Sequence, residues 1–492
     1  MRWTGATALT SIVALAFALV SPPSTPAQDE PSPLSVEDAL ALALVDHPEV
    51  EIATLELESR LGALHASRSP YDFVLRGSLR HRSEVQPALD LLTGGDKVVT
   101  TRDEQSVGVS KKLDFGLTLD VQLRTFKGET NSENATFNPA RVVRLETTLR
   151  QPLLRDRVLD ADRRAELAAE SATRLARAEV KAARLRAEHD VRRKHLALAL
   201  AQAEMGARQD AVISAREQVE SSRARVGAGT LSQLDLELTE GELAQRQGEL
   251  LDATAVRIDA QEALLDVLGP GWTGGPIVVT ALQEVAAASV SGEEPPLERR
   301  VDLVRLQEEV TDAESELRHR RGRLKPQLDV VATYGAVAIG GSDLRADEVI
   351  DTGRVFDEAG RGEFPNWSLG LEVTHELGRR AAKGSLQEAF ALLEADRARL
   401  RRARERAELE LQSARRAARA DRRRLELARS QRELRERSFL AERRRFGAGF
   451  SSRDRVSRAQ EELIAAEIAE LRALAAVVES RIRMDEVLRL GG

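Results

Sequence analysis

Two stretches of the chain carry nearly the same seven residues: Val-Gly-Ala-Gly-Thr-Leu-Ser at 226–232 and Phe-Gly-Ala-Gly-Phe-Ser-Ser at 446–452. Each follows a long Arg- and Ala-rich stretch with helical spacing and precedes a second, shorter helical stretch. Glycine permits the backbone conformations that a tight reversal between two helices requires. The two copies therefore predict two helical hairpins in an internally duplicated chain.

The helical stretches have matching lengths. In the first half, 156–226 is as long as 36–67 and 230–268 laid end to end, and the second half repeats this relation to within a few residues. Beyond Leu386 the apolar positions recur at intervals of three, four or seven, which is the spacing of a coiled-coil seam. Each half is therefore predicted to be a coiled coil whose glycine turn lies at one end.

Segments with strict alternation of apolar and polar residues lie upstream of each predicted hairpin. They are 71–79, 117–124, 143–150 and 367–374, and 328–334 alternates less strictly. A period of two indicates strands with one apolar and one polar face. A soluble sandwich and a barrel with lipid outside and water inside both satisfy this pattern. We favour the barrel, because the remaining helices have too little apolar surface to cover a soluble sheet.

The order of these segments divides the chain into four parts. Residues 1–27 begin with Arg2, continue with an apolar run and end among prolines, as a secretory signal peptide does. The apolar run is shorter than the ~20 residues of a spanning helix, so we expect an exported chain. Residues 28–269 form the first repeat, 270–296 a Gly- and Pro-containing linker, and 297–492 the second repeat.

Composition excludes several classes of function. The 492 residues include no cysteine, which excludes disulfides, thiolate metal sites and a lipidated N-terminal cysteine. The formal net charge of -7 argues against a generally basic nucleic-acid binder. The stretch 379–446 is strongly basic and 230–268 is acidic, and opposite charges on neighbouring helices can pair. We therefore predict no nucleic-acid partner.

No enzymatic constellation is recognisable in the sequence. His189 and His195 are spaced so that they do not share one helical face as metal ligands, and His-Glu-x-x-His and P-loop patterns are absent. We predict that the protein is not an enzyme and has no catalytic residues, no cofactor and no metal site.

Several short motifs recur in a fixed order. They are Leu34-Ser35-Val36-Glu37-Asp38-Ala39-Leu40, then His47-Pro48-Glu49-Val50, Pro70 and Pro326 before strands, Gln151-Pro152-Leu153-Leu154 where strand passes into helix, and the two Gly-Ala-Gly turns. In this order and with these lengths the chain resembles the TolC-like outer membrane efflux protein family over essentially the whole mature sequence.

The resemblance implies an α+β membrane protein built as a homotrimer. Its strands would form one transmembrane β-barrel in the outer membrane, and its helices a long coiled-coil α-barrel through the periplasm. Its partners would be a periplasmic adaptor (membrane fusion) protein, an inner-membrane transporter and outer membrane lipid.

Two features depart from the family pattern. The second half has Glu376 where the first has Pro152, which predicts a different strand-to-helix junction. The first half has an extra predicted hairpin near 105–126, with its turn at Asp114-Phe115-Gly116. Two strands per half would give a trimer about 12 strands, whereas inclusion of the extra hairpin would give about 18. The sequence does not decide between these numbers.

Candidate site residues cluster at the glycine turns. Exposed backbone at Gly227, Gly229, Gly447 and Gly449 would let an adaptor grip the tip, although the same glycines also serve a plain turn. Family members close the tip with carboxylates and interhelix salt bridges. The corresponding candidates for a periplasmic gate are Asp235, Arg455 and Arg458, where arginine rings would favour anions. Ordinary solvated helix charge is the competing interpretation.

These features predict a passive exit duct in a tripartite efflux or type I secretion system. A periplasmic or secreted coiled-coil scaffold without a channel is the alternative from another class. It explains the helices and the signal peptide, but it does not explain strands with one apolar and one charged face. The substrate is left open, since a shared duct carries little substrate chemistry.

Overall fold

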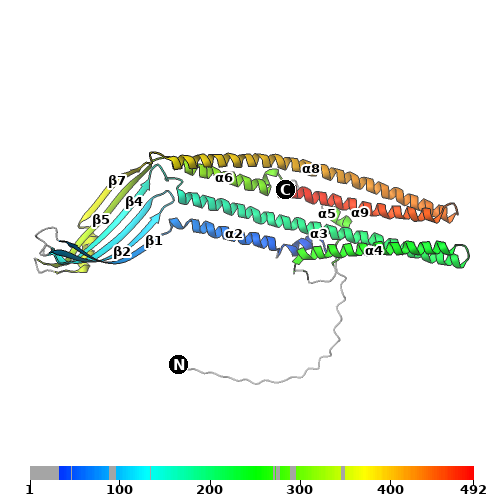
Figure 1. Cartoon of the computed structure of the whole chain (residues 1–492), viewed down its shortest axis with the longest axis horizontal. Helices are drawn as coiled ribbons and strands as arrows, with labels where there is room; N and C mark the ends of the chain where they lie inside the picture. The colour runs from blue at the N-terminus through cyan, green and yellow to red at the C-terminus, as the bar shows by residue number, and fades with distance from the viewer. Residues whose placement is uncertain are drawn as a thin grey trace, which may run out of the picture.

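The computed structural model describes residues 33–45, 47–87, 96–132, 135–269, 272, 277–288, 295–344 and 349–491. The predicted signal peptide at 1–27 and part of the predicted linker at 270–296 lie outside these residues. The described chain forms a long rod, with a β-sheet at one end and two helix–helix turns at the other (Figure 1).

The helices repeat the same order in the two halves. The first half contains α1 (Val36–Ala43), α2 (Pro48–Ser67), α3 (Ala161–Gly227) and α4 (Gln233–Leu268). The second half contains α6 (Val301–Gly322), α8 (Arg380–Gly447) and α9 (Arg453–Arg489). Shorter helices are α5 (Leu282–Ala288), α7 (Thr352–Arg361) and the 3-10 turns η1 (Ser69–Tyr71) and η4 (Leu297–Arg299). No helix among the described residues combines the length and apolar character of a membrane-spanning segment.

Local sequence explains where these helices start. The stretch 36–67, expected as one helix, is two, because Pro48 begins α2 and the side chain of His47 caps it. Asp160 caps α3, and Ser232 caps α4 in a reciprocal capping box with Asp235. The predicted long helices are therefore confirmed, with boundaries shifted by a few residues.

Seven strands form one antiparallel sheet. They are β1 (Val74–Pro87), β2 (Lys97–Lys112), β3 (Thr118–Thr130), β4 (Phe137–Pro152), β5 (Gln327–Asp343), β6 (Val349–Ile350) and β7 (Pro365–Thr374). The order is β1-β2-β3-β4-β5, and both β6 and β7 pair with β5. The predicted extra hairpin is β2–β3, which lies inside the sheet between β1 and β4. Its turn contains Gly116 with φ of +87°.

The two faces of the sheet differ in polarity. Paired residues such as Leu75 and Val109, or Tyr334 and Trp367, share one face. That face exposes large apolar side chains: Leu75, Leu79, Val107, Val109, Leu145, Leu149, Trp367, Leu369, Leu371 and Val373. On the opposite face Arg150 forms ion pairs with Asp329 and Glu372, at 3.0 and 2.6 Å. The predicted alternation is confirmed, and most of its apolar side is uncovered in the single chain.

Helix α7 has no counterpart in the sequence expectations. Its Val355 and Ala359 are buried against Val143 and Ala338 of the sheet, so it covers part of the apolar face. Asp351 caps it and Gly362, with φ of +70°, ends it. Its length, near the lower limit for a recognisable period, explains why the sequence pattern did not reveal it.

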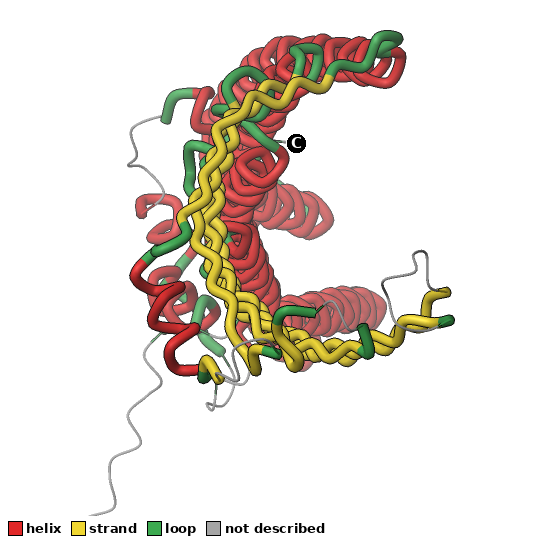
Figure 2. The backbone as a smooth tube through the Cα atoms, turned by 90° about the vertical axis from the view of Figure 1, so that its left-hand side faces the viewer, coloured by secondary structure: helices red, strands yellow, loops and turns green. Residues whose placement is uncertain are grey.

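Helix α3 lies at the centre of the helical part. It packs against α2 and α4 of its own half and against α6 and α9 of the other half. Helix α8 packs against α6 and α9. In end view the sheet and the helices follow one open arc (Figure 2). Helices α2 and α4 with strand β1 therefore form one edge of the arc, and α8 with β7 forms the other.

The largest apolar core lies midway along the rod. There Leu34 pairs with Val279 in an isolated parallel bridge, and both pack with Leu198 and Leu264. The fully buried His195 places its Nε2 atom 2.9 Å from the carbonyl oxygen of Leu34. This core ties the N-terminal segment to α3 and α4.

Burial of His195 makes the stability of this core depend on pH. Burial lowers the pKa of His195, and the bond to Leu34 opposes this only in part. An unfolded histidine titrates near ~6.5, so the unfolded chain binds the proton first as pH falls. We expect the unfolding midpoint of the purified protein to decrease between about pH 7.5 and pH 5.5, and His195→Gln to reduce that decrease. The exposed His65 supplies the control, His65→Gln. An unchanged pH dependence in His195→Gln would contradict this assignment.

Candidate functional site

The end of the rod opposite the sheet consists of two helix–helix turns. Helix α3 ends at Gly227 and α8 ends at Gly447. Gly229 and Gly449 have φ values of +70° and +78°, the left-handed region that glycine favours. Gly227 and Gly447 do not have positive φ, because each is still the last residue of its helix. The predicted conformational role therefore applies to the second glycine of each turn only.

The surface around these glycines is open. A Cβ atom built on any of the four would meet no other atom within 4 Å. Phe450, directly after the second turn, is 83% exposed. Packing within the single chain therefore does not require small residues at Gly227 and Gly447.

Arg453 at the start of α9 connects the two turns. Its Nη1 atom donates to the main-chain oxygen of Asp235 at 2.6 Å, and its Nη2 atom donates to the hydroxyl of Thr239. Thr239 is buried and its hydroxyl also contacts that of Ser222 on α3, at 3.4 Å. One arginine of the second half therefore binds the first turn of α4.

A cation–π contact connects the turns a second time. The guanidinium carbon of Arg225 on α3 lies 5.7 Å from the ring centroid of Phe446 on α8. Contacts of this type contribute about 0.5–1 kcal/mol at exposed sites. Together with Arg453, this contact holds the two hairpin ends side by side.

The predicted gate residues have other partners. The Asp235 carboxylate accepts a hydrogen bond from the Ser232 hydroxyl at 2.6 Å. That bond, with a smaller contribution from the charge of Arg453, lowers the pKa of Asp235. Arg458 lies 3.8 Å from Asp454 of its own helix. No ion pair joins Asp235 to Arg455 in the described part of the chain, so the structure brings Asp235 together with Arg453 instead.

Sequence reasoning missed Arg453, although a signal existed. Gln460 hydrogen-bonds Gln218 of α3, and Ile464 packs against α3 as well. Arg453 precedes these two residues by intervals that keep it on the same helical face, whereas Arg455 lies two positions further on and faces elsewhere. Following the contact face of α9, rather than the charged residues nearest the turn, would have selected Arg453.

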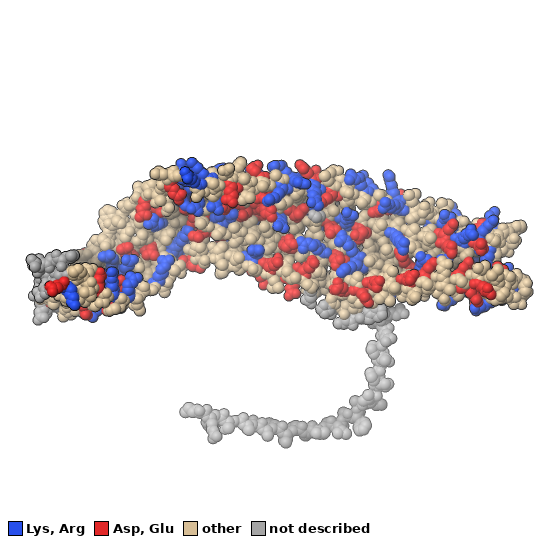
Figure 3. Space-filling model, viewed as in Figure 1, with Lys and Arg blue, Asp and Glu red and all other residues tan. Residues whose placement is uncertain are grey.

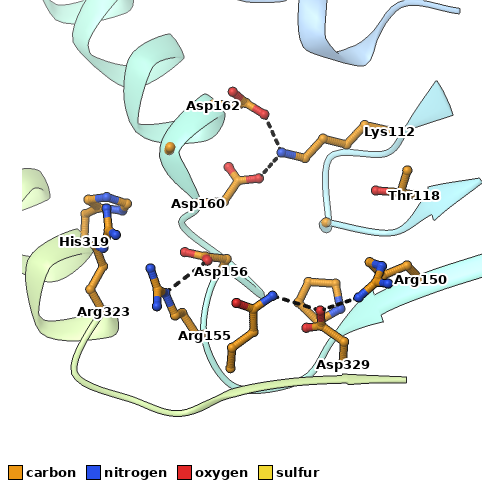
Figure 4. Close-up of a pocket in the computed structure, with 14 residues that line it drawn as sticks. Lys112, Thr118, Arg150, Arg155, Asp156, Asp160, Asp162, His319, Arg323 and Asp329 are labelled. Atoms are coloured by element: carbon orange, nitrogen blue, oxygen red, sulfur yellow. Dashed lines mark hydrogen bonds and ion pairs between the residues drawn. The ribbon is translucent and has the colours of Figure 1, made fainter. Parts of the chain in front are cut away.

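Charged residues also gather where the sheet meets the helices. A cavity of about 370 Å³ lies between the ends of β4 and β5 and the start of α3 (Figure 4). Lys112 contacts both Asp160 and Asp162 there, and Arg150 pairs with Asp329 (Figure 4). These groups compensate one another's charge and join the sheet to α3. No group of three His, Cys, Asp or Glu side chains placed to hold a metal occurs among the described residues.

The two strand-to-helix junctions differ, as predicted. After Pro152 the chain takes an irregular segment to Asp160, whose side chain caps α3. After Thr374 a shorter segment leads to Arg379, which has φ of +47° and provides no side-chain cap for α8.

Comparisons with known proteins give one consistent result. No family model and no curated protein matches the sequence. Solved structures do match: the CmeC outer membrane channel of Campylobacter jejuni has 14% identity and a TM-score of 0.58, over 93% of this chain and 86% of that one. The outer membrane protein VceC of Vibrio cholerae has 16% identity and a TM-score of 0.60, over 93% and 96%. The open-state MtrE channel of Neisseria gonorrhoeae has 15% identity and a TM-score of 0.61, over 93% and 89%. The predicted fold of the single chain, long helices with a β-sheet part as in outer membrane channels, is therefore confirmed.

Loss of Arg453 is expected to separate the two hairpin ends. Hydrogen bonds from a charged group contribute about 1.5–3 kcal/mol, and Arg453→Ala removes both of those described above. Because the chain has no cysteine, spin labels can be placed specifically at Ala228→Cys and Ala448→Cys. We expect a longer and broader distance distribution between the labels in Arg453→Ala. Arg458→Ala is the matched control, and identical distributions in both variants would contradict the role of Arg453.

Proposed function

We propose that this chain, which has the fold of the TolC-type outer membrane channels, is one third of a passive exit duct. Three copies would close the arc of Figure 2 into a tube through which substrate leaves the periplasm. The duct would serve a tripartite efflux or type I secretion system, as the exit for an inner-membrane pump. The observation that carries this proposal is the sheet whose apolar face is uncovered except beneath α7 and whose opposite face is charged.

The sheet has two long edges that suit closure with further copies. Strand β1 has 14 residues and β7 has 10, and among the described strands β1 pairs only with β2 and β7 only with β5. Unpaired strand edges expose hydrogen-bonding groups that another strand can satisfy. Pairing of β1 with β7 of the next copy would close a barrel of about 18 long strands, extra hairpin included.

The apolar face has the extent that a membrane requires. On β4 the odd-numbered residues 143–151 face the apolar side, together with their partners on β3 and β5. Transmembrane strands need about 9–11 residues. Beyond this band the same face carries Arg141 and Lys127, which suit the polar edge of a bilayer. We therefore place the sheet in the outer membrane, and the helices in the periplasm.

The free end of the helices is the proposed docking and gating region. The periplasmic adaptor would contact the open surface at Gly227, Gly229, Gly447 and Gly449. The inner-membrane transporter would supply the energy, so the duct itself needs no cofactor. Asp235, Arg455 and Arg458 would line the narrow opening, with Arg453 holding it closed. Arginine side chains at a constriction favour the passage of anions.

The assembly can be tested on protein extracted from outer membranes with detergent. We expect light scattering to give the mass of a trimer, and negative-stain images to show a hollow rod longer than about 100 Å, the length of α3 alone. Bilayer recordings should show ion currents with a preference for anions. A soluble monomer or dimer without a lumen would overturn the duct and favour the coiled-coil scaffold. A conducting trimer with cation preference would overturn only the arginine gate.

Adaptor docking can be tested where added side chains do not strain the turn. Gly227→Leu and Gly447→Leu place bulk at helical positions with open surroundings, unlike changes at Gly229 and Gly449. We expect an intact trimer that has lost most adaptor binding and efflux. Gly206→Leu, also open but far from the turn, is the control. Unchanged efflux and adaptor binding in the double variant would show that these glycines only form the turn.

A further inference from the structure

The contact between the two halves of one chain shows how two copies would meet. In one chain, α3 of the first half packs against α9 of the second. By position in the duplication, α8 corresponds to α3, and α4 corresponds to α9. Continuation of the arc would therefore place α8 of one copy against α4 of the next. We propose that this contact between copies repeats the α3–α9 contact, with the charges of one ion pair and the side-chain sizes of one packing contact exchanged between the two helices, an inference that rests on the closed trimer proposed above.

Corresponding residues follow from the turns. Helix α3 ends at Gly227 and α8 at Gly447, while α4 begins at Gln233 and α9 at Arg453. Both pairs differ by 220 positions. The same shift therefore relates every residue of the first hairpin to its counterpart in the second.

Charge is reversed at one of the ion pairs between α3 and α9. The ion pairs of Arg193 with Glu479 and Glu486 are not reversed, because Ser413 takes the place of Arg193 on α8. Glu204 of α3 pairs with Arg472 of α9, with a distance of 2.7 Å from Oε1 to Nε. Their counterparts are Arg424 on α8 and Asp252 on α4. The Arg424 side chain is 74% exposed and contacts only Asp421 of its own helix among the described residues. Asp252 is also exposed. Across copies, Arg424 and Asp252 would form the same pair with opposite polarity.

The large and small side chains also exchange helices. This occurs one to two helical turns beyond the ion pair of Glu204 along α3. Within one chain, the small Ala207 and Ala211 of α3 receive the large Ile464 and Ile468 of α9. This is the usual complementarity of knobs and holes at a helix seam.

The counterparts of these residues exchange the roles of the two helices. Leu427 replaces Ala207 on α8, and it is 65% exposed. Ala244 and Gly248 replace the two isoleucines on α4, and a Cβ atom on Gly248 would meet nothing within 4 Å. An exposed leucine on α8 and an open site between small residues on α4 therefore lie at the same height along the rod. These two surfaces fit each other only between different copies, because α8 and α4 lie at opposite edges of the arc.

A buried polar pair is replaced by two leucines. His189 of α3 is 1% exposed and its Nε2 atom lies 2.8 Å from Asp485 of α9. Their counterparts are Leu409 on α8, which is 64% exposed, and Leu265 on α4. The exposure of Leu409 is costly in a single chain, and contact with Leu265 of the partner subunit would remove it.

The remaining charge on the two edges is complementary. Exposed arginines of α8 without an ion-pair partner among the described residues include Arg401, Arg402, Arg416, Arg419, Arg422, Arg423, Arg443 and Arg444. Exposed carboxylates of α2 and α4 that likewise have no ion-pair partner among the described residues are Glu49, Glu51, Glu56, Glu58, Glu237, Asp252, Asp259 and Glu262. Figure 3 shows basic side chains projecting along the α8 edge and acidic side chains near α4. Rotation about the long axis preserves the level of each residue, so these rows would meet along their length.

Reversal of charge also prevents the wrong contact. If α3 of one copy met α4 of another, Glu204 would face Asp252 of the partner subunit, and two carboxylates would repel each other. The reversed pattern therefore permits the contact within a copy and the contact between copies to alternate around the ring.

Cross-linking tests the contact directly, because the chain has no cysteine of its own. We expect the full-length double variant Leu427→Cys, Gly248→Cys to form covalent dimers and trimers on oxidation. In the control variant Arg416→Cys, Gly248→Cys, the cysteine on α8 lies at a different height along the rod from the cysteine on α4. We expect no cross-link in this variant. A trimer in light scattering without cross-links in the first pair would overturn this contact and leave the duct intact. Absence of any trimer in the unsubstituted protein would overturn both.

Charge exchange tests the polarity of the contact. Arg424→Asp and Asp252→Arg should each shift the trimer toward monomer by about tenfold in the dissociation constant, and the combined variant should restore the trimer. Arg177→Asp, an exposed position on the central helix α3 away from either edge, is the control and should leave the trimer unchanged. Equal weakening in both single variants without restoration in the combined variant would overturn the Arg424–Asp252 pair.

Discussion

The contact between the two halves of the chain determines the rest of the architecture. Strand β4 pairs with β5, and α3 packs against α6 and α9, so both layers are joined along the same line. The largest apolar cluster, midway along the rod, combines residues of both halves, such as Leu198 of α3 and Val478 of α9. Because the halves join side by side, the chain curves into an arc with two edges. At each edge, a strand and the helices beside it lack a neighbour on their outer side. The assembly of several copies that we propose rests on this geometry more than on any single residue.

The distribution of apolar and charged side chains explains the low aromatic content of the chain. The helices pack through alanine and leucine, as at Ala407 and Leu400, with the charged side chains on the outer faces. The large exposed apolar side chains are concentrated instead on one face of the sheet, where Trp367 and Leu371 lie. A soluble protein rarely exposes such a contiguous face. The duct that we propose would place lipid on that face and water on the charged face beside Arg150.

The two ends of the rod are held by different kinds of interaction. Near the sheet, Lys112 between two aspartates and Arg150 beside Asp329 form a compact set of mutually compensated charges. At the turns, two hydrogen bonds from Arg453 and one cation–π contact from Arg225 connect the hairpins. A region held by few contacts opens at lower free energy than one held by many. The end that we propose as the gate is therefore the end held by fewer charged contacts.

The sequence by itself determined the element types, the duplication and the two faces of the sheet. These features are local, since a period of two, a heptad spacing and a Gly-Ala-Gly turn each record the environment of neighbouring residues along one element. Only the tertiary structure decided which residues meet: that the β2–β3 hairpin joins the sheet, that α7 covers part of it, and that Arg453 rather than Arg455 reaches Asp235. Such contacts depend on the rotation and level of one helix or strand relative to another. A shift of two residues on a helix moves a side chain to a different face, and a local pattern does not specify that shift.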